Sequence, residues 1–499
     1  MEYIISVFNF TNLYALIIGV VVGLIIGALP GMGAYTGVAL LIPLTFVMTP
    51  TSSLLMLTAL YTAGIYGGSL TAILLYVPGT SASAVTAIEG YEFTKRGRPM
   101  EAIQMATFAS VTGGLISGVL LLLVAPPLSQ VSLAFGPPEY FLLAVFGLTA
   151  VGSIASGKVV KGLISGFIGL FLSTIGIDLN SGYPRYTFGI SGLEGGIDVV
   201  SAVIGLFALS QVLILSEDPF KKAVSTIKKV GWNVFPNFSQ IKKVGFFTFL
   251  RSYIIGIFIG LLPAAGANVA QWISYAEARR VGKPEDNFGK GSLKGIAAAE
   301  AANNATTGSS LVPLFVFGIP GSVTAAILLG ALMIHGLTPG ITLFTRQAHI
   351  VYPVIWGFIF ANVIMAGFAI LFVRQVANFV RLPRGILIPL IVTLCVVGVY
   401  AKTNSFFQIW VMSLFGLMGY GMRKTDFSPA AVLLGLILGP ICESGFRSTL
   451  NMADTFLVFY LVRRPISLGL LALTIIVVLF IVRREIRESR LKKQAKEKV

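Results

Sequence analysis

Long apolar runs, separated by short polar or charged stretches, recur along the whole chain. Runs of roughly 17 to 25 apolar residues, folded as α-helices, cross the ~30 Å hydrocarbon core of a bilayer. Apolar runs lie near residues 13–29, 103–125, 139–155, 159–176, 197–215, 246–262, 323–335, 349–373, 385–401, 406–420, 428–442, 450–462 and 465–482. The pattern predicts an all-α polytopic membrane protein with roughly 10–12 transmembrane segments.

Some apolar runs near the N-terminus are too short to cross a bilayer comfortably. Residues 36–48 contain Pro43 in their middle, and residues 54–67 lead into Gly67-Gly68-Ser69. A further short run, 69–77, ends at Pro78-Gly79. Non-helical backbone at membrane depth is tolerated only where protein or a water-filled cavity surrounds it. These runs therefore predict re-entrant or broken helical hairpins.

The broken segments occur twice. The stretch Gly27-Ala-Leu-Pro-Gly-Met-Gly33 aligns without a gap with Gly260-Leu-Leu-Pro-Ala-Ala-Gly266. A second stretch, 67–80, aligns with 308–322 with one residue of slack. Two copies of a Gly/Pro-interrupted apolar segment are typical of transporters built from two repeats. If the N-terminus lies outside and the middle of the chain inside, the first copy crosses an odd number of times and the second is inverted.

A basic, polar stretch marks the boundary between the copies. We divide the chain into a first transmembrane repeat (1–215), a basic connector (216–245), a second repeat (246–462) and a terminal helix with a basic tail (463–499). Because cytoplasmic loops are enriched in lysine and arginine, we expect the connector and the C-terminus in the cytoplasm. The start of the chain contains no lysine or arginine, which predicts that the N-terminus lies outside the cytoplasm; in a bacterial inner membrane this would be the periplasm.

Composition supports the assignment as a membrane protein and argues against a nucleic-acid-binding or metal-binding protein. The chain is 56% hydrophobic and only 11% charged, and its net charge of +16 comes from short clusters between apolar runs. No basic face with aromatic platforms is present, so we do not expect a nucleic-acid partner. Cys395, Cys442, His335 and His349 have no metal-binding spacing, so we expect no metal site and read the histidines as hydrogen-bonded structural residues.

The candidate site lies in two windows that are polar but nearly free of charge. No ionisable side chain occurs between Tyr3 and Ile88 except tyrosine, and between Ala301 and Thr345 only His335 does. Proline removes a helical hydrogen bond and glycine adopts unusual φ values, so Pro-Gly breaks free backbone groups to meet an anion or a small cation. The predicted substrate- and ion-binding residues are Pro30, Gly31, Gly33, Thr36, Gly67, Gly68, Ser69, Thr71, Pro78, Gly79, Thr80, Ser81, Pro263, Gly266, Asn268, Asn303, Asn304, Thr306, Thr307, Ser309, Ser310, Pro320, Gly321, Ser322 and Thr324.

An anion held only by dipoles in a medium of low dielectric is poorly neutralised, which favours Na⁺ or H⁺ as a coupling ion. Glu300 fits two interpretations, a proton relay beside Asn303 or a helix-end residue near the membrane surface with Lys294. The chain has no Walker motif, no Gly-x-Ser-x-Gly and no His-Glu-x-x-His, so we expect neither ATP hydrolysis nor another enzyme activity, and no catalytic residue or cofactor. An ion gradient then drives transport; the alternative is a passive anion channel or pore.

The same residues resemble the large membrane subunit of the tripartite tricarboxylate transporters, the TctA family. The matching stretches are 27–33, 66–80, 84–90, 262–267, 302–305, 318–322 and 336–340, which span most of the chain. The resemblance implies a permease of the bacterial inner membrane that imports citrate or another carboxylate by symport, commonly with Na⁺. It also implies two partners, a small four-helix membrane subunit and a periplasmic solute-binding protein. A homodimer, and the choice between an elevator and a rocking motion, stay open.

Overall fold

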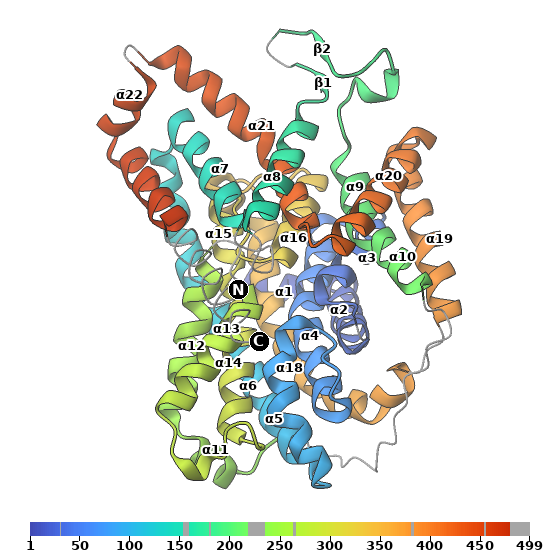
Figure 1. The fold of residues 1–499 in the computed structure, drawn as a ribbon, viewed down its shortest axis with the longest axis vertical. Helices are drawn as coiled ribbons and strands as arrows, with labels where there is room; N and C mark the ends of the chain where they lie inside the picture. Colours follow the sequence, from blue (N-terminus) through green and yellow to red (C-terminus); the bar gives the residue numbers. More distant parts are fainter. Residues whose placement is uncertain are drawn as a thin grey trace, which may run out of the picture. The chain divides into compact units, whose positions relative to one another are not determined.

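The computed structural model describes residues 1–29, 31–152, 159–178, 181–217, 235–262, 266–380, 384–453 and 456–479. Most of the predicted connector and the whole basic tail lie outside these ranges. The described residues are predominantly helical, and their only strands are β1 (Gly176–Ile177) and β2 (Pro184–Arg185), which pair antiparallel. The all-α prediction is confirmed (Figure 1).

Six helical stretches of the described residues are long and apolar enough to cross a membrane. They are Phe10–Ala28, Pro50–Leu75, Pro99–Ala134, Val199–Ser216, Ala348–Ala369 and Pro429–Met452. The number rises to 8 if two bent pairs, 238–261 and 457–479, each form one span. Four shorter apolar helices accompany them: Ala34–Thr45, Val160–Ser173, Val323–Ile334 and Ile388–Thr403. The chain is a multi-pass membrane protein, and the predicted segment count is reached only when these shorter helices are included.

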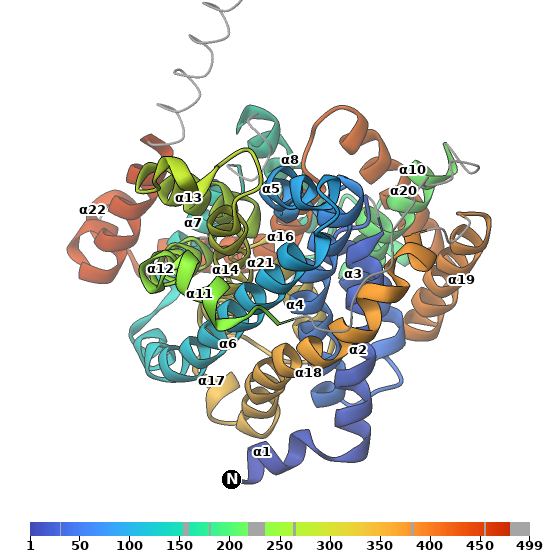
Figure 2. The ribbon, with the colours of Figure 1, turned by 90° about the horizontal axis from the view of Figure 1, so that it is seen from below.

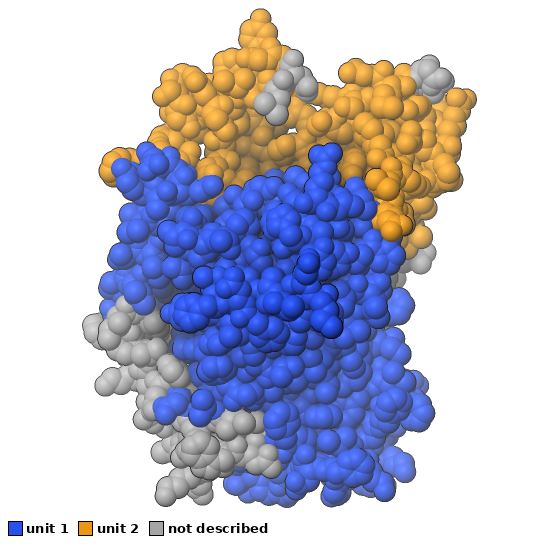
Figure 3. All heavy atoms as spheres, turned by 180° about the vertical axis from the view of Figure 1, so that it is seen from behind, with its two compact units in different colours: residues 1–129, 207–404 blue, residues 130–206, 405–499 orange. Residues whose placement is uncertain are grey.

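The chain folds into two compact units, each made from both halves of the sequence. Unit 1 comprises residues 1–129 and 207–404, and unit 2 comprises residues 130–206 and 405–499 (Figure 3). The predicted sequence repeats, 1–215 and 246–462, divide the chain in sequence order and so do not coincide with these units; their boundaries stay a prediction.

In the first half of unit 1, α1 (Glu2–Val7) precedes α2 (Phe10–Ala28), α3 (Ala34–Thr45) and α4 (Pro50–Leu75). Helices α2 and α4 pack closely because Gly19, Gly23 and Gly27 face α4, where an added Cβ would lie 2.1–2.8 Å from a backbone oxygen. Thr49 caps α4 by accepting a hydrogen bond from the Ser52 amide, and Pro50 occupies the first turn. After a break come η1 (Ser81–Ser83), α5 (Ala84–Lys95) and α6 (Pro99–Val131).

The position of the first-half break differs from the sequence prediction. Helix α4 runs without interruption through Gly67-Gly68-Ser69 and ends at Leu75, followed by Tyr76 in the left-handed region (φ 60°). The two glycines serve close packing instead, since a Cβ on Gly67 would meet the Leu24 backbone and one on Gly68 would meet Thr80. The prediction of two short runs here is therefore wrong; one long helix precedes the Pro78-Gly79 break.

The second half of unit 1 is also helical. Helix α11 (Phe238–Val244) leads into α12 (Phe246–Leu261), α13 (Gly266–Arg280), α14 (Leu293–Ser309), α15 (Leu311–Phe317) and α16 (Val323–Ile334), with η5 (Pro284–Asp286) before α14. Helices α12, α13 and α14 lie side by side in Figure 1 and Figure 2. Unit 1 also contains α10 (Ser210–Ser216), α17 (Ile341–Phe344), α18 (Ala348–Val380) and α19 (Arg384–Thr403).

Unit 2 packs α7 (Pro137–Gly152) and α8 (Val159–Ser173) against α21 (Pro429–Met452). It also contains η2 (Ser132–Ala134), η3 (Ser191–Leu193), α9 (Val199–Val203), α20 (Phe406–Lys424) and α22 (Leu457–Arg463). A π-helical turn, Ile204–Leu209, follows α9.

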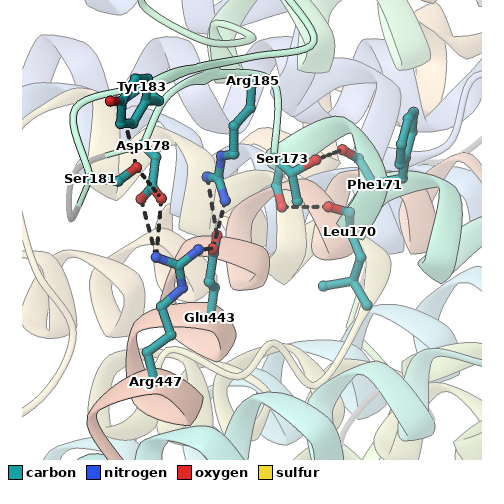
Figure 4. Close-up of polar contacts among 10 residues, drawn as sticks. Leu170, Phe171, Ser173, Asp178, Ser181, Tyr183, Arg185, Glu443 and Arg447 are labelled. Atoms are coloured by element: carbon teal, nitrogen blue, oxygen red, sulfur yellow. Dashed lines mark hydrogen bonds and ion pairs between the residues drawn. The ribbon is translucent and has the colours of Figure 1, made fainter. Parts of the chain in front are cut away.

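Ion pairs anchor the β1–β2 hairpin to α21, as Figure 4 shows. Arg447 Nη1 lies 3.0 Å from Asp178 Oδ2, and Arg185 Nη1 lies 2.6 Å from Glu443 Oε1. A third pair links Arg447 to Glu443 at 2.7 Å. The two arginines and two carboxylates therefore form one network that fixes the ends of the hairpin on the helix.

Candidate functional site

Two helix breaks in unit 1 are built in the same way. A Cβ on Gly79 would lie 1.9 Å from the carbonyl oxygen of Gly27 and 3.0 Å from the Cα of Gly68. A Cβ on Gly321 would lie 2.2 Å from the carbonyl oxygen of Gly260 and 2.9 Å from the Cα of Ser310. The aligned sequence pairs thus make equivalent backbone contacts, and only glycine fits at either break. The two breaks share this close packing, and the division of the chain into two inverted repeats stays a prediction.

Side chains join the first-half break to the second half of unit 1. Ser81 donates a 2.8 Å hydrogen bond to Asn268 Oδ1 near the start of α13. Gln271 Nε2 donates to the Ser81 carbonyl at 2.7 Å, and Gln271 Oε1 accepts from the Val85 amide at 3.1 Å. The segment after Pro78-Gly79 is therefore held against α13.

A tyrosine of α4 contacts the second-half break. The Tyr61 hydroxyl lies 3.2 Å from Ser310 Oγ and 2.9 Å from Ser322 Oγ, at hydrogen-bonding distance from both. Ser322 also caps α16 by accepting from the Ala325 amide. A Cβ on Gly266, at the start of α13, would lie 3.4 Å from Ser322 Cβ. The start of α13 and the start of α16 are therefore close together.

One face of α14 points toward the first-half break. Residues three and four apart on a helix share a face, which places Glu300, Asn303, Asn304 and Thr307 together. Asn303 Nδ2 donates a 2.9 Å hydrogen bond to the carbonyl of Ala82 in η1. All four side chains are fully buried.

The Asn303 and Asn304 amides are incompletely hydrogen-bonded. Asn303 Oδ1 and both Nδ2 and Oδ1 of Asn304 are buried without a partner in the protein. An unsatisfied buried donor or acceptor costs about 1–3 kcal/mol, so several of them on one face indicate a place where another molecule is met. The amide nitrogen can donate to a carboxylate oxygen, and the amide oxygen can accept from a hydroxyl or approach a cation. Thr36 Oγ1, on α3, is likewise buried and unpartnered.

Glu300 is enclosed by hydroxyl groups from three other helices. Ser69 of α4 donates to Oε1 and Ser110 of α6 to Oε2, each at 2.7 Å, and Thr86 of α5 donates to Oε1. Lys294 instead pairs with Asp286 at 2.8 Å. The interpretation of Glu300 as a helix-end residue at the surface with Lys294 is therefore wrong, since Glu300 is fully buried.

Other predicted site residues occupy different positions in unit 1. Thr306 Oγ1 and Ser309 Oγ donate to carbonyls of α14 itself and to Gly256 of α12, on the face of α14 away from η1. The remaining predicted residues also belong to unit 1. Gly33 is the N-cap of α3, and Gly31 has a φ of 82°. The Thr71 hydroxyl donates to the Gly68 carbonyl, and the Thr80 hydroxyl donates to Ser83 Oγ. Thr324 is buried in α16, and Pro320 precedes Gly321. Pro30 and Pro263 lie outside the described residues.

Sequence reasoning missed Tyr61, Thr86, Ser110 and Gln271. Tyr61 and Ser110 lie inside apolar runs with no motif around them, so nothing in their spacing marks them. Gln271 carried a weak signal, an uncharged polar side chain six residues before a charged loop. Each is recognised only by its partner, which lies far away in the sequence.

No group of three or more His, Cys, Asp or Glu side chains that could hold a metal ion occurs among the described residues. His335 Nε2 lies 3.1 Å from Thr45 Oγ1, which confirms its reading as a hydrogen-bonded structural residue. The polar side chains that remain around the breaks are hydroxyls and amides. Such groups hold an anion or a small cation without covalent chemistry.

Comparison with known proteins identifies relatives over most of the chain. Residues 13–434 match the family model of the tripartite tricarboxylate transporter TctA family. An uncharacterized 52.8 kDa protein of Agrobacterium vitis, in the TAR-I ttuC' 3' region, is 33% identical over 480 residues, 96% of this chain and 95% of its own. A second uncharacterized Agrobacterium vitis protein, in the TAR-II ttuC' 3' region, is 29% identical over 235 residues, 47% of this chain and 97% of its own. No solved structure matches.

Proposed function

Because the chain belongs to the TctA family of tripartite tricarboxylate transporters, we propose that it is the large permease subunit of a tripartite secondary active transporter. It imports an organic di- or tricarboxylate across a bacterial inner membrane, driven by a gradient of Na⁺ or H⁺. A periplasmic solute-binding protein delivers the substrate, and a small four-helix membrane subunit completes the complex. The relatives with measured similarity are uncharacterized, so the choice of substrate rests on the chemistry of the site.

The observation that carries this proposal is the pair of buried, incompletely bonded amides beside a broken helix. Asn303 uses one amide hydrogen-bonding group on Ala82, and Asn304 uses none within the protein. A carboxylate supplies acceptors for the amide N–H groups, and a substrate hydroxyl or a coupling cation satisfies the amide oxygens. A bound ligand thus supplies the hydrogen bonds that the Asn303 and Asn304 side chains do not form within the protein.

Neutral donors suit a transporter better than a buried arginine would. A bidentate Arg–carboxylate pair is strong and directional, and in a medium of low dielectric it would hold the substrate tightly. A transport site must release its ligand on the other side of the membrane, which requires binding that is favourable but weak enough to leave. Amides and hydroxyls meet this requirement at the cost of leaving the substrate charge to be balanced by a co-transported cation.

Uptake into proteoliposomes tests the proposal. The chain is reconstituted with its small membrane subunit, the binding protein is added outside, and radiolabelled citrate and succinate are supplied under a Na⁺ gradient, a pH gradient, both or neither. We expect accumulation above the equilibrium level that requires both the binding protein and a gradient. Uptake that only equilibrates, whatever the gradient, would indicate the alternative, a passive anion channel. No uptake of any carboxylate by an intact complex would reject a carboxylate permease.

A further inference from the structure

The described part of unit 1 buries two carboxylates completely, Glu89 on α5 and Glu300 on α14. Neither forms an ion pair with a described cation, so each owes its stability in the interior to hydrogen bonds. The kinds of donor that surround them differ, and this difference determines which protonation states each can adopt.

Glu89 accepts mainly from groups that can only donate. The backbone amides of Gly289, Gly291 and Ser292 bond its carboxylate at 2.6, 3.0 and 2.8 Å, and the Tyr275 hydroxyl bonds it at 2.6 Å. Backbone N–H groups cannot accept a hydrogen bond in return, so Glu89 acts only as an acceptor toward them. Glu89 thereby fixes the loop that leads into α14, a structural role.

Glu300 accepts only from hydroxyl groups, those of Ser69, Thr86 and Ser110. A hydroxyl can rotate and both donate and accept. With Glu300 ionised, all three hydroxyls donate to it. With Glu300 protonated, its own O–H donates to one hydroxyl, which turns to accept. The surroundings of Glu300 therefore accommodate both protonation states without movement of the backbone.

The position of Glu300 connects it to the proposed substrate site. Glu300 precedes Asn303 and Asn304 by one turn on the same face of α14, where Cβ atoms lie about 5–6 Å apart. A carboxylate substrate on these amides faces the Glu300 carboxylate through an interior of low dielectric, and two negative charges there repel strongly. Substrate binding therefore favours protonated Glu300, and protonation of Glu300 favours substrate binding, because coupling between two sites is reciprocal.

From this geometry we propose that Glu300 carries the coupling proton, binding one H⁺ as the carboxylate substrate enters and releasing it as the substrate leaves. This inference rests on the proposed transport function. The proton joins Glu300 Oε1 or Oε2 and leaves from the same group, so no bond other than that O–H is made or broken. Two of the hydroxyl partners, Ser69 and Thr86, lie on either side of the 76–83 break that also contacts Asn303. A movement of the 76–83 segment therefore affects both the Glu300 carboxylate and the Asn303 amide.

The elements packed around Glu300 bring few other titratable groups. Tyr66 of α4 is close enough to interact electrostatically with Glu300, and its hydroxyl bonds Thr107. The other titratable or charged side chains on these elements are Tyr61 of α4, Glu89, Tyr91, Glu92 and Lys95 of α5, Glu101 of α6, Lys242 and Lys243 of α11, Arg251 and Tyr253 of α12, Tyr275, Glu277, Arg279 and Arg280 of α13, and Lys294 of α14. None of these is bonded to Glu300. Tyr66 is a phenol and stays neutral at physiological pH, so it does not compete with Glu300 for the coupling proton.

A proton fits this position better than Na⁺. The hydroxyl groups already bond both carboxylate oxygens directly, and a metal ion would have to break these bonds and take oxygens from several helices at once. A proton needs only the rotation of one hydroxyl. A Na⁺ ion bound by the same oxygens is an outcome that the test below distinguishes.

The test compares Glu300→Gln with the wild-type complex in the proteoliposome assay with radiolabelled citrate and succinate. Glutamine keeps the shape of the protonated side chain and cannot release a proton. We expect Glu300→Gln to lose accumulation driven by a pH gradient, while exchange of external for internal labelled substrate persists and becomes independent of pH. Binding of the substrate in detergent, measured by protection from thermal unfolding, should lose its dependence on pH.

Glu89→Gln is the matched control, since it removes the other buried carboxylate of unit 1. It should lower thermal stability, because one side-chain N–H group now faces backbone N–H donors, yet the folded fraction should keep the wild-type pH dependence of exchange. Thr86→Val, which removes one hydroxyl beside Glu300, should shift the pH midpoint of substrate binding without abolishing it.

The outcomes separate the proposals. Accumulation by Glu300→Gln that still follows the pH gradient overturns the role of Glu300 and leaves the transport function intact. Accumulation by the wild type that follows Na⁺ alone, and is lost in Glu300→Gln, assigns the site to Na⁺ and overturns the proton. A wild-type complex that moves no carboxylate under any gradient rejects the transport function itself.

Discussion

Gly79 lies so close to the carbonyl oxygen of Gly27 that a Cβ on Gly79 would stand 1.9 Å from it. The corresponding pair in the second half, Gly321 and Gly260, would come within 2.2 Å. In each half the broken segment therefore rests directly on the backbone of the helix that leads into the other aligned motif of that half, residues 27–33 or 260–266. This contact explains why glycine, rather than any small residue, follows the proline at both breaks.

We predict that Gly79→Ala and Gly321→Ala each destabilise the protein, by about 1–3 kcal/mol, because backbone on both sides must shift to admit a methyl group. The measurement is the unfolding temperature of the purified protein in detergent. Gly367→Ala is the control, since that helical glycine has nothing within 4 Å of an added Cβ. Equal unfolding temperatures for all three variants would contradict the packing described here.

At Asn304 we expect a substitution to abolish uptake without lowering stability. Leucine has the same number and branching of side-chain heavy atoms, and it removes two buried polar atoms that have no partner. We predict that Asn304→Leu leaves stability unchanged or raises it by about 1–3 kcal/mol, since the unsatisfied groups disappear. The same variant should lose substrate uptake in the proteoliposome assay.

Asn303→Leu provides the matched comparison for Asn304→Leu. It also removes the hydrogen bond to Ala82, so this variant should lose both uptake and part of the stability. An Asn304→Leu protein with wild-type uptake would show that this amide does not contact the substrate.

The sequence predicts the helical membrane class and the doubled breaks because both depend on local properties. Apolar run length determines whether a helix can cross a bilayer, and a Pro-Gly pair interrupts a helix wherever it occurs. The prediction fails at Gly67-Gly68, where α4 continues without interruption. These glycines fit a helix because Leu24 and Thr80 approach them, and such contacts between distant segments leave no periodic signal in the sequence.

The sequence identifies only part of the candidate site, because the other part depends on contacts between distant segments. Asn303 and Asn304 stand out as amides in an uncharged window, so composition alone identifies them. The sequence of Glu300 and its neighbours fits two interpretations, because its three hydroxyl partners come from α4, α5 and α6 and only the fold brings them together. Tyr61 has no sequence signal at all, yet it bonds the second-half residues Ser310 and Ser322.

A hydrogen bond between the two halves of unit 1 gives a further prediction. Ser81 donates to Asn268 at 2.8 Å, and this bond helps to hold the first-half break against α13. Ser81→Ala and Asn268→Ala should each lower stability modestly, and the double variant should lose less than the sum, with a coupling energy of about 0.5–1.5 kcal/mol. Thermal unfolding of the four proteins in detergent measures this cycle. Strictly additive losses would mean that the bond does not form in the membrane protein.

The ion-pair network of unit 2 supports a prediction about its hairpin. Arg447 bonds both Asp178 and Glu443, and Asp178 is 6% exposed, so removing the guanidinium takes an ion-pair partner from a largely buried carboxylate. We predict that Arg447→Met loosens the segment 176–196 and speeds its amide hydrogen exchange, because opening that segment hydrates the Asp178 carboxylate, which has lost this partner. Arg98→Met is the control, since Arg98 pairs with Glu101 on an exposed surface, where such pairs contribute about 0–1 kcal/mol. Hydrogen exchange followed by mass spectrometry should therefore show faster exchange in 176–196 for Arg447→Met alone, and equal rates in the two variants would show that the network does not hold the hairpin.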